Sequence, residues 1–191
     1  MSLIEYIAAL GIAAILVVMI VSAAQPILRK VRCGKCIANL RQIGTVILQF
    51  AGEHEGALPT PGNSSDPNIP QWPTAMKDYD IYLTNKVLLC PSDTDPLRFA
   101  NGYSYAMNGN LSKGFDVTKK VYDPLRLVSV PNRSQIVLFA DSIASKNGRS
   151  VNWNTVSLLH DGRFNAVFLD GHVATLRPED APAANWKPAS Q

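Results

Sequence analysis

The sequence predicts an α+β fold in which a long N-terminal α-helix packs on an antiparallel β-sheet head. A run without charge over residues 6–24 and an amphipathic pattern that continues to about residue 53 predict the helix. Apolar runs separated by Asp-Gly pairs between residues 127 and 177 predict the sheet, because this pattern is typical of hairpins. The chain has 191 residues, which leaves roughly 110 to 130 residues for one globular head.

The first part of the helix, residues 1–26, is apolar and long enough to cross a membrane. At about 1.5 Å per residue, residues 6–24 span roughly 28 Å, close to the thickness of a hydrocarbon core. Glu5 lies at the edge of this run, where an unpaired carboxylate is costly. The N-terminal amine of a neighbouring copy is its natural partner. The segment lacks the basic start of a signal peptide, although the small residues 22–24 leave a cleaved signal as a minor alternative.

Residues 27–53 are predicted to form the amphipathic half of the same helix. Apolar or small side chains recur there at alternating spacings of three and four, which places them on one helix face. This seam consists of Cys33, Cys36, Leu40, Ile43, Ile47 and Phe50. Pro26, at the junction of the two halves, predicts a kink. The segment from Glu53 to Gly56 predicts the end of the helix.

The head is predicted to occupy residues 54–191, with two distinct parts. A long Pro-rich loop covers about residues 57–100 and includes a short helix somewhere between 72 and 87. An antiparallel β-meander covers about residues 127–177, and Asp161-Gly162 and Asp170-Gly171 separate its last three strands. The strand-like runs are 127–130, 135–140, 156–159, 164–169 and 173–176. The tail from residue 178 onward is predicted to be extended.

The opening Ser-Leu-Ile-Glu, followed by the apolar run and its amphipathic extension, resembles the mature N-terminus of type IV pilins and type II secretion pseudopilins. The chain is also similar to a subgroup of this family common in planctomycete- and verrucomicrobia-like bacteria. That subgroup ends in a signature of His, nine residues and Asp-Gly, which His160, Asp170 and Gly171 match. Further similar segments lie at residues 36–44, 56–59, 90–93 and 104–108. Together these segments cover almost the whole chain.

The resemblance implies a lollipop-shaped subunit of an extracellular, pilus-like helical filament on the cell surface. Such subunits reside in the inner membrane before assembly, and a prepilin peptidase and an assembly platform act on them. Met1 and Glu5 are the implied assembly residues. Met1 stands where the family usually has an aromatic residue with a methylated amine, and the chain reads as already processed.

Two alternatives accompany this interpretation. One is a pseudopilin or minor pilin of a type II secretion or DNA-uptake machine. The other is a single-pass, membrane-anchored binding or metal-dependent protein that never polymerises. The sequence leaves open whether nucleic acid is a partner.

Positive charge is concentrated just after the apolar run, although the net charge is only +3. Residues 29–41 contain no acid and five cations, namely Arg29, Lys30, Arg32, Lys35 and Arg41. The positive-inside rule alone would place this side in the cytoplasm. The resemblance places it outside, and we follow the resemblance.

The three cysteines, Cys33, Cys36 and Cys90, suggest a disulfide rather than a metal or haem site. The chain has a single C-x-x-C pair, and no His follows Cys36. In an extracytoplasmic head we expect one bridge from Cys90 to either Cys33 or Cys36, with the other thiol buried. Three buried thiols are the alternative.

His160, Asp170 and His172 lie on or beside adjacent predicted strands, with Asp141 or Asp161 nearby. Two imidazoles and a carboxylate could bind a divalent metal or act in acid–base chemistry. The interpretation that we favour is structural: these side chains hydrogen-bond the turns, and Gly171 supplies a positive φ. No nucleophile motif, phosphate loop or metal-ligand helix accompanies them. We therefore expect no enzymatic activity and no cofactor, with a divalent metal as the minor alternative.

Overall fold

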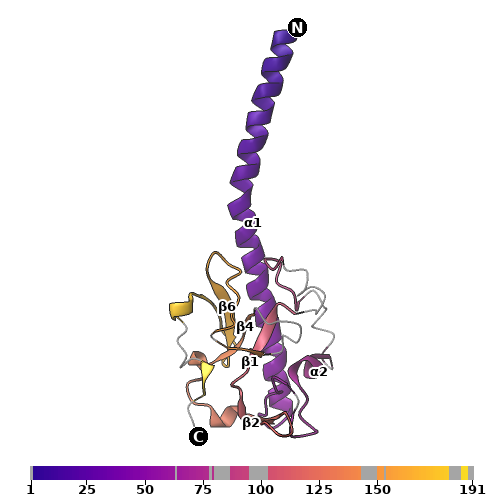
Figure 1. The fold of residues 1–191 in the computed structure, drawn as a ribbon, viewed down its shortest axis with the longest axis vertical. Coiled ribbons are helices and arrows are strands. Elements are labelled where there is room, and N and C mark those ends of the chain that lie inside the picture. The colour runs from indigo at the N-terminus through magenta and orange to yellow at the C-terminus, as the bar shows by residue number, and fades with distance from the viewer. Residues whose placement is uncertain are drawn as a thin grey trace.

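The computed structural model describes residues 2–62, 64–77, 79, 87–94, 103–142, 150–152, 154–180 and 186–188. Helix α1, Leu3–Glu53, runs the full length of the molecule, and its N-terminal part projects from a head built around its C-terminal part (Figure 1). The predicted α+β class, a long helix on an antiparallel sheet, is therefore confirmed.

Helix α1 ends where its sequence predicts, at Glu53. Ser2 is the N-cap, and His54, the C-cap, donates its backbone N–H to the carbonyls of Phe50 and Ala51. Gly56 then adopts φ +80°, a conformation that favours glycine and turns the chain away. The helix remains continuous through Pro26, and its axis changes direction about midway along its length (Figure 1), as an interior proline favours.

In the part of the head that the structure describes, five strands form the main sheet, in the order β5-β1-β4-β6-β7. The pairs β1–β4, β4–β6 and β6–β7 are antiparallel, whereas the short β5 runs parallel to β1 at the edge. The strands are β1 Tyr105–Asn108, β4 Val137–Asp141, β5 Ser150–Val151, β6 Phe164–Phe168 and β7 Val173–Leu176. A separate hairpin pairs β2, Ser112–Asp116, with β3, Val121–Pro124.

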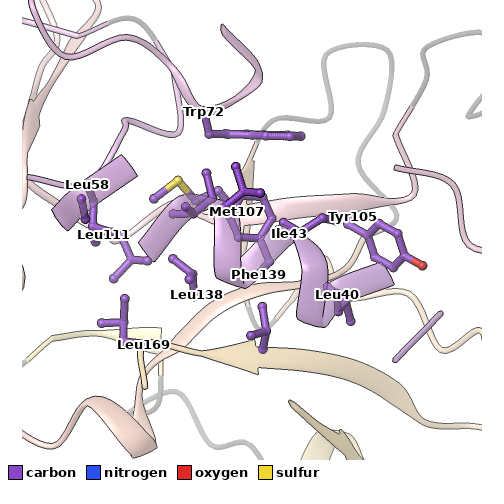
Figure 2. Packing of buried hydrophobic residues seen from close by; sticks show 14 of the residues in the cluster. Leu40, Ile43, Leu58, Trp72, Tyr105, Met107, Leu111, Leu138, Phe139 and Leu169 are labelled. Carbon is purple, nitrogen blue, oxygen red and sulfur yellow. The ribbon is translucent and has the colours of Figure 1, made fainter. Parts of the chain in front are cut away.

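The main core lies between α1 and one face of the sheet (Figure 2). Every member of the predicted seam is buried except Cys33, which is half-buried. Helix α1 lies close to β6 at Gly44, where an added Cβ would lie 2.7 Å from Cγ2 of Val167. Any larger residue would force the Val167 side chain or the helix to shift at this point of the interface. Trp72 of α2, Trp72–Lys77, covers Phe139 edge-on at a ring-centroid distance of 5.1 Å.

The other face of the sheet carries a second core, so β4 and β6 are buried along their whole length. Trp186, from the C-terminal tail, is 1 % exposed and packs against Phe164. Its carbonyl accepts a hydrogen bond from Nδ2 of the buried Asn108 at 3.0 Å. The tail is thus anchored at Trp186, which the sequence prediction of an extended tail did not include.

The predicted meander is partly wrong. Residues 135–140, 164–169 and 173–176 do contain strands β4, β6 and β7. Residues 127–130 instead form a 3-10 turn, η1 Leu127–Ser129. The run 156–159 makes only an isolated bridge, between Val156 and Ser142. Strand β1 completes the sheet by pairing with β4. The alternation of apolar residues did not predict this strand.

Candidate functional site

The N-terminal half of α1 is an uncovered apolar surface. Its large apolar side chains between Leu3 and Val31 are 46–77 % exposed in the isolated chain. This helix passes the length and composition test for a membrane span, and none of its most apolar window is buried. A helix that is apolar all round needs lipid or other helices around it. The protein is therefore compatible with membrane anchoring or with helix–helix assembly.

Glu5 participates in a capping box at the start of α1. Its carboxylate accepts the backbone N–H of Ser2 at 2.8 Å, and the Ser2 hydroxyl accepts the backbone N–H of Glu5 at 3.4 Å. The sequence contained this signal, since Ser followed three residues later by Glu is the capping-box pattern. Met1 lies outside the described residues. The cap therefore holds the negatively charged Glu5 carboxylate at the N-terminus of α1, where the helix dipole is positive.

A disulfide joins α1 to the loop that carries Cys90. It uses Cys36, with 5.1 Å between the two Cα atoms and a sequence separation of 54. One turn further along α1, the buried Asn39 donates from Nδ2 to the carbonyl of Leu89 at 3.0 Å. Cys33 is the free thiol and is half-buried, rather than buried as expected.

His160 lies beside this disulfide and pairs with a buried carboxylate at the end of β4. Its Nε2 is 3.0 Å from Oδ2 of Asp141 and 3.7 Å from Sγ of Cys90. The same Oδ2 accepts the backbone N–H of Asn165 at 2.7 Å. The tight turn at Asp161 and Gly162, both at positive φ, reverses the chain directly after His160. Helix, loop, strand and turn therefore converge on one buried polar cluster.

Burial sets the electrostatics of this cluster. Desolvation raises the pKa of Asp141, although the hydrogen bond and charge of His160 oppose the shift. Oδ1 of Asp141 has no hydrogen-bond partner among the described residues. Burial also raises the pKa of Tyr105, and the negative charge of Asp141 adds to that effect. The sequence analysis named Asp141 only as one of two acids near His160. It did not predict the direct pair, because His160 lies in a separate segment of the chain.

Asp170, Gly171 and His172 form a separate, exposed turn between β6 and β7. The Asp170 carboxylate accepts the backbone N–H of His172 at 3.1 Å and pairs with its Nδ1 at 2.6 Å. Partial burial alone would raise the pKa of Asp170, but these hydrogen bonds outweigh it and lower the pKa. Gly171 has φ +90°. An exposed pair of this kind contributes at most about 1 kcal/mol.

The structure does not bring His160 together with Asp170 and His172. They lie at opposite ends of β6, whose five residues span roughly 16 Å. Among the described residues, one group of three potential metal ligands lies within 4.8 Å: Cys36, Cys90 and His160. Its two sulfurs are bonded to each other. The geometry thus favours the structural interpretation of the turn residues over a shared metal site.

Comparisons with protein-family models, with curated proteins and with solved structures found no significant match. Function is therefore inferred from the motifs and the geometry described above.

Proposed function

We propose that the protein is a structural subunit of an extracellular, type IV pilus-like filament, assembled through the N-terminal half of α1. The observation that supports this most strongly is the contrast along one helix. Its C-terminal half is buried in the subunit's own core, whereas its N-terminal half exposes apolar side chains that no part of the described chain covers.

Assembly would remove this apolar surface from lipid or water by packing it against the same helix of other copies. Burial from water contributes roughly 25 cal/mol per Å², while packing in place of lipid depends on close contact between helices. The small residues Ala8, Ala9 and Gly11 permit such contact in the N-terminal half of α1. Nothing lies within 4 Å of a Cβ added at Gly11 in the isolated chain.

Glu5 would set the register of this assembly. In the isolated subunit its carboxylate already accepts the Ser2 N–H, so it is held near the helix start in an orientation fixed by the cap. A neighbour's N-terminal amine would add the opposite charge, and a carboxylate in a dry helix bundle is costly without one. Among the residues of the head that the structure describes, we assign none to catalysis, and we propose that the protein is not an enzyme.

The decisive experiment is electron microscopy of a sheared cell-surface preparation from cells that express the full chain. Helical filaments labelled by an antibody against the head support the proposal. A protein that is present and folded in the inner-membrane fraction, but absent from any filament, would instead support a single-pass anchored protein. Short filaments confined to the envelope would support the pseudopilin alternative.

A further inference from the structure

A cavity of about 610 Å³ lies where α1 leaves the head. Its walls come from segments far apart in the sequence: α1, the loop after Cys90, the turn after His160, and β7. Cavities of roughly 300–1,000 Å³ are typical of small-molecule sites. Among the described residues, Ser92, Thr175 and one acid, Asp161, also line it.

Basic side chains dominate this cavity. Arg29, Lys30 and Arg32 line it from α1, and Arg163 lines it from the head. None of these four makes an ion pair with an acid in the part of the chain that the structure describes. Four cations around one hollow, with Ser92 beside them, are suited to a phosphate group, whereas the Thr175 hydroxyl already donates to Oδ1 of Asn165.

The position of the cavity along α1 indicates which kind of phosphate group could reach it. Arg29 is the first charged residue after Glu5, and it follows Ala24, the last small apolar residue of the run, by five residues, which is roughly 7.5 Å along a helix. When the apolar half of α1 spans a bilayer, Arg29 and Lys30 lie at the level of the lipid headgroups, since these extend beyond a core of about 30 Å. Basic residues at this depth attract anionic lipids.

We propose that this cavity binds the phosphate headgroup of an anionic phospholipid while the subunit resides in the membrane. The cations of α1 approach the headgroup from the helix side, and Arg163 closes the site from the head. A bound headgroup would thereby fix the head against the membrane surface. This inference rests on membrane insertion of α1, which is part of the proposed function, but it does not depend on filament formation.

The test uses the full-length chain in detergent micelles, with native mass spectrometry to count retained lipids. Phosphatidylglycerol and phosphatidylcholine with identical acyl chains separate anionic from zwitterionic headgroups. We expect phosphatidylglycerol to be retained at least fivefold more tightly. Arg163→Gln and Arg29→Gln should each reduce this preference about fivefold, the effect typical of one basic residue near a charged surface.

Arg133→Gln is the matched control, because Arg133 is exposed on the head and does not line the cavity. It should leave the preference unchanged, and thermal melting should show that all three variants keep the wild-type fold. Equal retention of the two lipids, or an equal loss in Arg133→Gln, would overturn the proposal. So would displacement of the lipid by millimolar inorganic phosphate, which indicates a free-anion site. Tighter, Arg163-dependent binding of a short DNA duplex would reassign the cavity to nucleic acid. None of these results depends on whether filaments form.

Discussion

The two halves of α1 belong to one uninterrupted helix but have opposite environments. From Leu3 to Val31 the large apolar side chains are exposed, whereas the seam residues from Cys36 to Phe50 are buried against the sheet. Helix propensity does not distinguish the halves, since both are continuous helix. The difference is what covers them: the C-terminal half is covered by the head, whereas none of the described residues covers the apolar N-terminal half.

This contrast separates folding from assembly. The head obtains its core from the C-terminal half, together with the Cys36–Cys90 bridge and the cluster of His160 and Asp141. The N-terminal half contributes nothing to that core, so its substitutions should change association without changing head stability. The predictions below test this separation, from the largest expected effect to the smallest.

Glu5→Ala should abolish filament assembly or slow it sharply, while the protein remains in the membrane. Insertion depends on apolar length, which the substitution preserves, whereas register depends on the carboxylate. Filament yield in sheared fractions, measured beside the amount of protein in membrane fractions, checks this. Glu179→Ala, a charge removal on the exposed surface of the head, is the control and should assemble normally. Normal yield from Glu5→Ala would remove the basis for a charge pair.

Cys90→Ala should lower the free energy of unfolding of the head by about 2 to 4 kcal/mol, because the bridge closes a loop of 54 residues in the unfolded chain. Chemical denaturation followed by tryptophan fluorescence measures this change. Cys33→Ala should have a smaller effect, since Cys33 is free and half-buried. Three alkylatable thiols in the non-reduced wild-type protein would contradict the bridge itself.

A matched pair of glycine substitutions compares the two halves directly. Gly44→Ala should destabilise the head by about 1 to 3 kcal/mol, because the new methyl group would overlap Val167 across the helix–sheet interface. Gly11→Ala adds the same methyl group to the exposed half, where nothing lies within 4 Å. It should leave head stability unchanged, and thermal melting of both variants measures the difference. Equal melting temperatures would show that the interface at Gly44 tolerates a side chain.

The sequence was sufficient to predict the elements whose signal is local. The apolar run, the seam, the helix end near Gly56 and the Asp-Gly turns all follow from neighbouring residues. Strand β1 was not predicted, and Asp141 was predicted only as one of two acids near His160, because both contacts depend on pairing between separate segments. The isolated bridge at Val156 lies between Asp141 and His160 in the sequence, and the hydrophobic periodicity of the chain does not predict their contact.

The signature His160 to Asp170-Gly171 illustrates the same limit. The favoured interpretation placed its residues at the turns, with a shared metal site as the minor alternative, and β6 separates its two ends. One end is a buried histidine beside the disulfide, and the other is an exposed turn. The spacing therefore reflects the length of one strand between two turns, rather than a shared site.

The smallest predicted effect is a pH dependence of the stability of the head, which is built around the buried half of α1. Folding raises the pKa of Asp141 above its ordinary value of 3.8. Asp141 therefore stays protonated to a higher pH in the folded protein than in the unfolded chain. The contribution of Asp141 to the free energy of unfolding therefore falls as pH rises above 3.8, by at most about 1.4 kcal/mol per pH unit for one proton. Asp141→Asn removes this contribution, and its stability should decline less than that of the wild type over the same range.

Asp170→Asn is the control for this measurement, because folding shifts the pKa of Asp170 in the opposite direction. The folded state lowers the pKa of Asp170, so its contribution is present above the ordinary value of 3.8 and is lost as pH falls below it. Denaturation of both variants and the wild type at a series of pH values separates the two windows. If Asp141→Asn follows the wild-type profile above 3.8, the carboxylate is not desolvated in the folded head. The cluster beside the disulfide would then be open to solvent, and the C-terminal half of α1 would be covered less completely than its contacts indicate.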